Sequence, residues 1–478
     1  QHLLQQHAPD PAHQVDISIS QRWHLWASLG RAYVVSADWH AAQLNYTAML
    51  AFARSCIEPI MECEALVCLA NVALHQSFDL KTASALLQQA LTVAQTSAAP
   101  AALAQTEWNL AQSGYYAWDL AESLAHAERA FNLARDQGLA ELSARSLYAM
   151  AHAQWRLGHW EASKEHALAA YDIYHSHADR AMQCSSLHLL GRAQIHLGDP
   201  LAGISSTRAA YDISVEIGHV WATIQSASTL CVGLREIGDY AEAIRFGQAA
   251  LTQARLKQNP VILLMSLGAL GTTLQEALQL NEARIIFRDA QALGDSIALR
   301  PYAALVASMH CAVAAMLEKW DEATEWALRA LKARDPSSLH LTDWSRCYET
   351  EALLRGGYAT QAQEDVHRFG DCVASNRRYR IPYLRTLAVL ARWEAHYDQA
   401  LLFLWEALDL ASAIGLPGEQ WRIAQATGEI YLAQGQQQAA QTAVANAASI
   451  VASLSESFAD EARRSTFLSS PFIQRLIG

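Results

Sequence analysis

A short turn recurs along this chain at intervals of 40 residues. It reads Leu-Gly-His-Trp at residues 157–160, Leu-Gly-Asp-Pro at 197–200 and Ile-Gly-Asp-Tyr at 237–240. Its last position, which we call the anchor, recurs every 38 to 41 residues, at Trp39, Leu80, Leu120, Trp160, Pro200, Tyr240, Leu280, Trp320, Tyr358, Tyr397 and, in degenerate form, Gln436. A period of this length indicates a repeat array, in which each unit packs mainly on its neighbours.

The chemistry around each anchor predicts a helix, a sharp turn and a second helix. Asp often precedes the anchor, where its carboxylate accepts from the first N–H groups of the following helix. Gly stands two positions before the anchor in several copies, where it can adopt the left-handed conformation that ends the preceding helix. Nine residues before the anchor the side chain is usually small, as at Gly191 and Cys231. Small residues at fixed positions let neighbouring helices approach closely.

This pattern resembles the tetratricopeptide (TPR) repeat, over about residues 22–450. The TPR family has a small residue in its first helix, a Gly-Asp/Asn-Tyr turn and alanines in its second helix, whereas the unit here is about 40 residues long instead of 34. Longer repeats of this kind are similar to the sensor arm of MalT-like regulators and related signal-transduction ATPases. The closing segment around Phe458 and Phe467 is similar to the last helix of such arrays.

We therefore expect an all-α fold, a right-handed α-solenoid (superhelix) of about eleven TPR-like helix-turn-helix repeats with a C-terminal capping helix. Residues 1–21 are interpreted as a linker or a remnant of an upstream segment. The superhelical array is expected over residues 22–452 and the capping helix over residues 453–478.

Composition narrows the classes of function. Hydrophobic residues make up 52% of the 478 residues, which favours a folded chain, and 11 prolines are few enough for helix nearly throughout. The formal charge of −12 argues against direct binding to nucleic acid, which requires a basic surface. No apolar run reaches the roughly 20 residues that span a bilayer, and we expect a cytoplasmic protein without membrane contact.

Catalytic signatures are missing from the sequence. It contains no phosphate-binding loop, no HExxH, no GxSxG and no dinucleotide fingerprint. We therefore predict a non-enzymatic protein with no catalytic residue, no cofactor and no metal site.

In a TPR-type superhelix the first helix of each repeat lines the concave groove. The resemblance places the groove residues 15, 12, 8, 5 and 4 positions before each anchor. From the third to the sixth repeat these positions carry four arginines, three histidines, five aromatic residues and one acid. The predicted binding residues are Trp108, Gln112, Tyr115, Tyr116, Arg145, Tyr148, His152, Trp155, Arg156, His188, Arg192, His196 and Arg235.

Such a groove in an acidic protein suits an anionic ligand, because arginine supplies forked donors and aromatic rings supply flat contact area. The alternative for the aromatic residues is a place in the core, and for the arginines a solvent-exposed face. The later repeats offer a second, weaker patch at Arg346, Arg385, Arg392, Trp393 and Trp421. Residues 376–380 are interpreted as a short basic loop that is either solvated or contacts an acidic partner domain.

The hypothesis is a binding module, the sensor or partner-recognition region of a larger signalling or transcription-regulating protein. Its partner would be a protein, an acidic peptide or a small anionic effector, bound in the concave groove. The resemblance also implies an upstream ATPase domain in the same polypeptide. The alternative hypothesis is a stand-alone TPR adaptor that joins other proteins and binds no small molecule.

Overall fold

The computed structural model describes residues 18–477, apart from positions 37, 78, 258, 298–299, 335–338, 340 and 374. The described residues form α-helices and one 3-10 helix, η1 (Leu341–Ser345), with no strand among them. The chain divides into two compact units, residues 1–153 and residues 154–478. Most of the predicted linker, residues 1–21, lies outside the described residues. Ser18 caps the first described helix, and residues 19–21 already belong to that helix.

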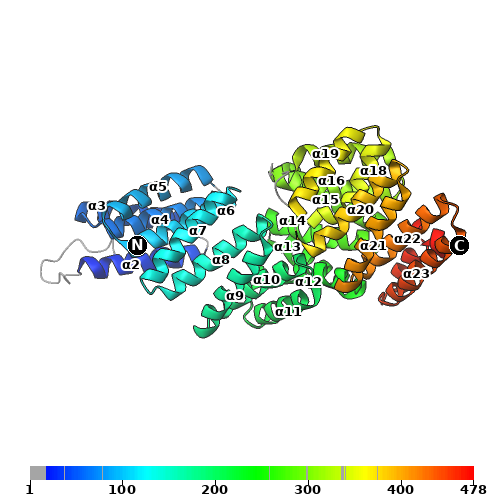
Figure 1. The fold of residues 1–478 in the computed structure, drawn as a ribbon. Helices are drawn as coiled ribbons and strands as arrows, with labels where there is room; N and C mark the ends of the chain where they lie inside the picture. The colour runs from blue at the N-terminus through cyan, green and yellow to red at the C-terminus, as the bar shows by residue number, and fades with distance from the viewer. Residues whose placement is uncertain are drawn as a thin grey trace, which may run out of the picture. The chain divides into compact units, whose positions relative to one another are not determined.

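Unit 1 is a succession of antiparallel helix pairs, joined by turns of two or three residues (Figure 1). Its helices are α2 (Ile19–Val35), α3 (Trp39–Cys56), α4 (Pro59–Ser77), α5 (Leu80–Thr96), α6 (Pro100–Tyr116), α7 (Leu120–Asp136) and α8 (Ala140–Arg156), the last of which runs three residues into unit 2.

Unit 2 continues the same alternation. Its helices are α9 (Trp160–Ser176), α10 (Arg180–His196), α11 (Pro200–Glu216), α12 (Val220–Glu236), α13 (Tyr240–Lys257), α14 (Pro260–Glu276), α15 (Leu280–Ile297), α16 (Arg300–Met316), α17 (Trp320–Ala333), α18 (Arg346–Arg355), α19 (Ala359–Val373), α20 (Arg377–Trp393), α21 (Tyr397–Ile414), α22 (Pro417–Ala433), α23 (Gln437–Glu456), α24 (Glu461–Leu468) and α25 (Pro471–Ile477). The segment predicted as one capping helix thus holds the end of α23 and two short helices.

The anchor positions start the second helix of each pair. Nine of them are the first residue of a helix, and Tyr358 and Gln436 directly precede one. The predicted caps are also present. Asp199 accepts from the backbone N–H of Ala202 at 3.1 Å, and Gly198 before it has a φ of 83°. Turn chemistry therefore placed the helix boundaries correctly from sequence.

Small residues bring paired helices together, as the repeat predicted. A Cβ on Gly191 of α10 would lie 2.1 Å from the Thr207 hydroxyl oxygen and 2.7 Å from the Gly203 carbonyl oxygen, both on α11. Ala170 and Ala210, ten residues after their anchors, are fully buried. The registers of small residues thus mark the helix contacts of each repeat.

Unit 2 also closes on itself, which its repeat pattern did not predict. The turns between its early helices contact helices about 180 positions later in the sequence. Gly198 lies against Arg378, at the start of α20, and Gly238 lies against Pro417, at the start of α22. Ion pairs join the same parts of the chain, since Arg378 of α20 pairs with Glu236 of α12 and Arg422 of α22 pairs with Glu276 of α14. The C-terminal ends of α10 and α12 are therefore covered by later helices of the same chain.

The interpretation of residues 376–380 as a basic loop was wrong. Asn376 caps α20 by accepting from the backbone N–H of Tyr379 at 3.0 Å, and the helix continues to Trp393. Arg378 is 2% exposed and Tyr379 is fully buried. Carboxylates from distant helices neutralise the charge of the buried Arg378. The sequence of a single repeat does not show which distant residues will lie beside it, so the burial could not be predicted.

The C-terminal segment packs back on unit 2. The rings of Phe458 and Phe467 lie 5.5 and 6.2 Å from the ring of Tyr240, measured between centroids. Among the described residues, every helix is too short or too polar to cross a membrane.

Candidate functional site

A row of aromatic rings follows the first helices of consecutive repeats in unit 1. Tyr115 and Tyr116 end α6, and Tyr148 and His152 lie on α8. The centroids of Tyr115 and His152 are 4.5 Å apart, and those of Tyr148 and His152 are 5.4 Å apart with rings nearly parallel. Each of these four side chains is partly exposed. We call Trp39, His75 and these four residues the aromatic row.

Sequence reasoning missed two members of this row. His75 at the end of α4 stands 6.5 Å from Tyr116, between ring centroids, and Trp39 stacks on His75 at 6.3 Å. His75 lies five residues before the anchor Leu80, the same register as Tyr115 before Leu120. Applying the groove register to the second repeat finds it, whereas Trp39 is itself an anchor and was assigned only to the turn.

Trp108 of α6 and Arg145 of α8, the two helices that carry most of the aromatic row, contact each other. The indole N–H of Trp108 donates to the backbone oxygen of Arg145 at 3.3 Å, and the guanidinium of Arg145 lies 5.4 Å from the Trp108 ring centroid. Arg145 also pairs with Glu141 at 2.5 Å, and both side chains are largely exposed. Gln112 is partly buried on α6. A surface of rings with one accessible guanidinium can take a chain segment by stacking and ion pairing.

The predicted groove residues of unit 2 have less access to solvent. Trp155, Arg156 and Arg192 are partly exposed, and the guanidinium of Arg192 lies 3.4 Å from the Trp155 ring centroid. His188 and His196 are 2% and 5% exposed. Both histidines are therefore almost inaccessible to a ligand in solution.

His196 belongs to a buried aromatic cluster. Its ring stacks on Trp160 at 4.8 Å, and its Nδ1 lies 2.8 Å from the hydroxyl oxygen of Tyr379 on α20. Tyr379 stacks on the same Trp160 at 4.7 Å. Burial raises the pKa of the Tyr379 hydroxyl well above its usual value, so the group stays protonated. This cluster ties α9 and α10 to α20.

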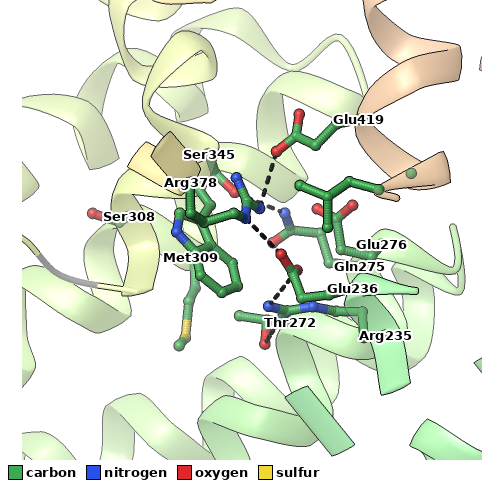
Figure 2. A pocket seen from close by; sticks show the side chains of 13 residues that line it. Arg235, Glu236, Thr272, Gln275, Glu276, Ser308, Met309, Ser345, Arg378 and Glu419 are labelled. Atoms are coloured by element: carbon green, nitrogen blue, oxygen red, sulfur yellow. Dashed lines mark hydrogen bonds and ion pairs between the residues drawn. The ribbon is translucent and has the colours of Figure 1, made fainter. Parts of the chain in front are cut away.

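Arg235, the last predicted residue, lies in a network of buried charges around a pocket. It donates to Thr272 Oγ1 at 2.7 Å and to Glu236 Oε1 at 3.2 Å. The other oxygen of Glu236 accepts from Arg378 Nε at 2.6 Å, as Figure 2 shows. Arg378 also pairs with Glu419 at 3.1 Å. Side chains from α12, α14, α20 and α22 thus meet at one place.

Further ion pairs surround this network. Arg385, which the sequence placed in a second patch, donates to Glu419 Oε2 at 2.6 Å, and Arg422 pairs with Glu276 at 2.8 Å. Burial alone would raise the pKa of Glu419, but the guanidiniums of Arg385, Arg378 and Arg422 outweigh it and hold that pKa below its usual value. Glu419 is therefore ionised at neutral pH.

The other residues of the second patch separate into buried and exposed ones. Arg346 is 4% exposed and pairs with Asp343 at 2.9 Å, and Trp421 is fully buried. Arg392 pairs with Glu351 and Glu429, at 3.1 and 2.9 Å, and Trp393 is exposed. These residues do not form one open surface.

Comparison with known proteins shows the fold. No protein-family model matches the chain, and no curated protein matches it significantly. A Rap protein complexed with Competence and Sporulation Factor is similar, with a TM-score of 0.51 and 14% identity over 83% of this chain and 99% of that one. The fold is an all-α solenoid. This likeness supports TPR-type repeats and, at 14% identity, extends no further.

Two other solved structures are less similar. The apo form of the quorum sensor NprR from B. thuringiensis has a TM-score of 0.47 and 11% identity, over 72% of this chain and 98% of that one. Yeast Tom70 has a TM-score of 0.39 and 11% identity, over 96% of both chains.

Proposed function

We propose that this chain is a recognition module that binds a peptide or protein segment across the aromatic row of unit 1. The observation that carries the proposal is the row itself. Six rings from α3, α4, α6 and α8 contact one another in sequence and remain accessible. Rings in a core are buried on all sides, whereas a partly exposed row offers flat contact area at little entropic cost.

Charge favours an acidic segment. The groove register of unit 1 carries arginines at positions 31 and 145 and histidines at 24, 75 and 152, and no carboxylate. A segment with Asp or Glu beside an apolar side chain would pair with Arg145 and stack on Tyr115 or Tyr148. The Rap protein of similar fold was solved with Competence and Sporulation Factor bound, which is in keeping with a binding role.

We also propose that this chain is one region of a larger protein. The resemblance to MalT-like sensor arms supports a place in a larger cytoplasmic signalling protein with an upstream ATPase domain. A stand-alone adaptor would use the same surface for a permanent partner. The sensor and the adaptor differ in one respect. In a sensor, binding at the aromatic row alters the activity of a linked domain, and in an adaptor it does not.

A peptide library displayed on phage tests the proposal. Selection on the full chain should enrich acidic sequences, and a synthetic peptide from that pool should bind in fluorescence anisotropy. Replacing both Tyr115 and Tyr148 by Ala should weaken binding at least tenfold, about 1.4 kcal/mol. Tyr171→Ala is the matched control, because that ring stacks on His175 of the same helix, α9. Equal binding by the double variant and the control would refute the assignment.

A further inference from the structure

Two arginines that line the pocket around Glu236 in unit 2 each have a buried donor without a protein acceptor. Arg378 uses Nε and Nη2 on Glu236 and Glu419, and Arg235 uses both Nη atoms on Thr272 and Glu236. Within the described part of the chain, Arg378 Nη1 and Arg235 Nε have no hydrogen-bond partner, although the residues are 2% and 4% exposed. Buried guanidinium N–H groups without an acceptor are strongly unfavourable.

Several of the acceptors that line the same pocket are already in use. Both oxygens of Glu236 and both of Glu419 accept from arginines. Glu276 Oε2 pairs with Arg422, and Thr272 Oγ1 accepts from Arg235. Among the lining side chains that the structure describes, the buried atoms without a partner are donors, including Trp344 Nε1. An acceptor supplied by a ligand would satisfy these donors.

The charge and the size of the pocket restrict which ligand could supply an acceptor. The network around the pocket has four guanidiniums (Arg235, Arg378, Arg385, Arg422) against three carboxylates (Glu236, Glu276, Glu419). An adjacent cluster has more carboxylates than guanidiniums and consists of Arg334, Arg346, Asp343, Glu349 and Asp365. The excess of positive charge around the pocket is therefore compensated nearby, and charge alone does not select the ligand.

The space open to the centre of a water molecule is about 30 Å³. One water needs about 10–15 Å³ of such space, so a group of two or three heavy atoms fits. Trp344 supplies an aromatic face beside this space, with the guanidinium carbons of Arg378 and Arg235 at 4.0 and 5.1 Å from its ring centroid.

We infer that this pocket binds a carboxylate group. Its oxygens accept from Arg378 Nη1 and Arg235 Nε, and the Trp344 ring contacts its apolar side. A carboxylate matches guanidinium geometry, adds the missing acceptors and carries a single charge. The group belongs either to a small free carboxylate or to the C-terminus of a peptide. The pocket residues are distinct from those of the aromatic row, so either site can fail in experiment without the other.

Calorimetric titration of the full chain distinguishes these sources. Sodium acetate is titrated at constant ionic strength against chloride, and trialanine with a free C-terminus is compared with its C-terminal amide. Saturable binding of acetate at one site per chain supports a free carboxylate. Binding of trialanine but of neither acetate nor the amide supports a peptide end. Heats equal to those of chloride for every probe, which would leave ordered water as the acceptor, overturn the inference.

The variant Gln275→Glu tests whether the probe binds in this pocket. Gln275 is 1% exposed, lines the pocket and is seen near Arg378 in Figure 2. The substitution is isosteric and supplies a carboxylate from the chain itself, so it should lower affinity for the bound probe at least tenfold while the helical circular dichroism spectrum is retained. Gln253→Glu makes the same charge change on the exposed side of α13 and should leave the affinity unchanged. Equal loss in both variants would also overturn the inference.

Discussion

Glu236 on α12 and Arg378 on α20 are 142 positions apart in the sequence and joined by a 2.6 Å bond between Arg378 Nε and Glu236 Oε2. Their side chains are 7% and 3% exposed. This buried pair links α12 to α20, and removal of one partner would leave the other charge buried without it.

Breaking this pair should be strongly destabilising. Glu236→Gln leaves Arg378 buried beside one carboxylate fewer, and we expect a loss of about 3–5 kcal/mol in the free energy of unfolding. Urea denaturation followed by tryptophan fluorescence measures it. Asp289→Asn is the control, because its pair with Arg255 is about half exposed and should contribute less than about 1 kcal/mol. Similar losses in both variants would contradict a special role for the buried pair.

Unit 2 should lose stability in acid through Glu419. The pKa of Glu419 is lower in the folded protein than its usual value of about 4.3. The unfolded chain therefore takes up a proton first as the pH falls, and stability is lost from about pH 4.3 downward through the folded pKa. Thermal melts between pH 7 and pH 3 should show this loss, and Glu419→Gln should be less stable at pH 7 but lose less on acidification. Parallel pH profiles would exclude Glu419 as a source.

Adding one methyl group at Gly191 should disrupt the packing of α10 on α11. The new Cβ would lie 2.1 Å from Thr207 Oγ1, and we expect Gly191→Ala to cost about 1–3 kcal/mol or more. A Cβ on Gly294 of α15 would meet no atom within 4 Å, so Gly294→Ala should stabilise by about 0.5–1 kcal/mol through helix propensity. Thermal denaturation of the two variants should therefore shift in opposite directions.

Restoring the missing cap before Trp160 should stabilise the protein. His159 makes no side-chain hydrogen bond to the start of α9, whereas Asp199 caps α11 in the equivalent turn. His159→Asp should therefore raise the free energy of unfolding by about 0.5–1 kcal/mol, and Asp199→Ala should lower it by about as much. A melting temperature unchanged by His159→Asp would show that another group already satisfies these N–H donors.

The candidate sites were predictable to different degrees. Tyr115, Tyr116, Tyr148 and His152 follow from a register within single repeats, and the structure brings their rings into contact. Whether they bind a partner stays a prediction. The same register selected Arg235, but its neighbour in the charge network, Arg378, was assigned to a loop, because their proximity depends on how far unit 2 turns before it meets itself.

The sequence by itself determined the helices, their turns and their pairing, because caps, glycine conformations and small residues act between neighbours about 40 positions apart. Tertiary structure alone decided which inner faces stay accessible. Small rotations between successive repeats accumulate along a solenoid, and no local pattern records their sum. In unit 2 that sum brings α20 and α22 onto α12 and α14, and it converts a predicted open groove at Arg235 into an enclosed network of charges.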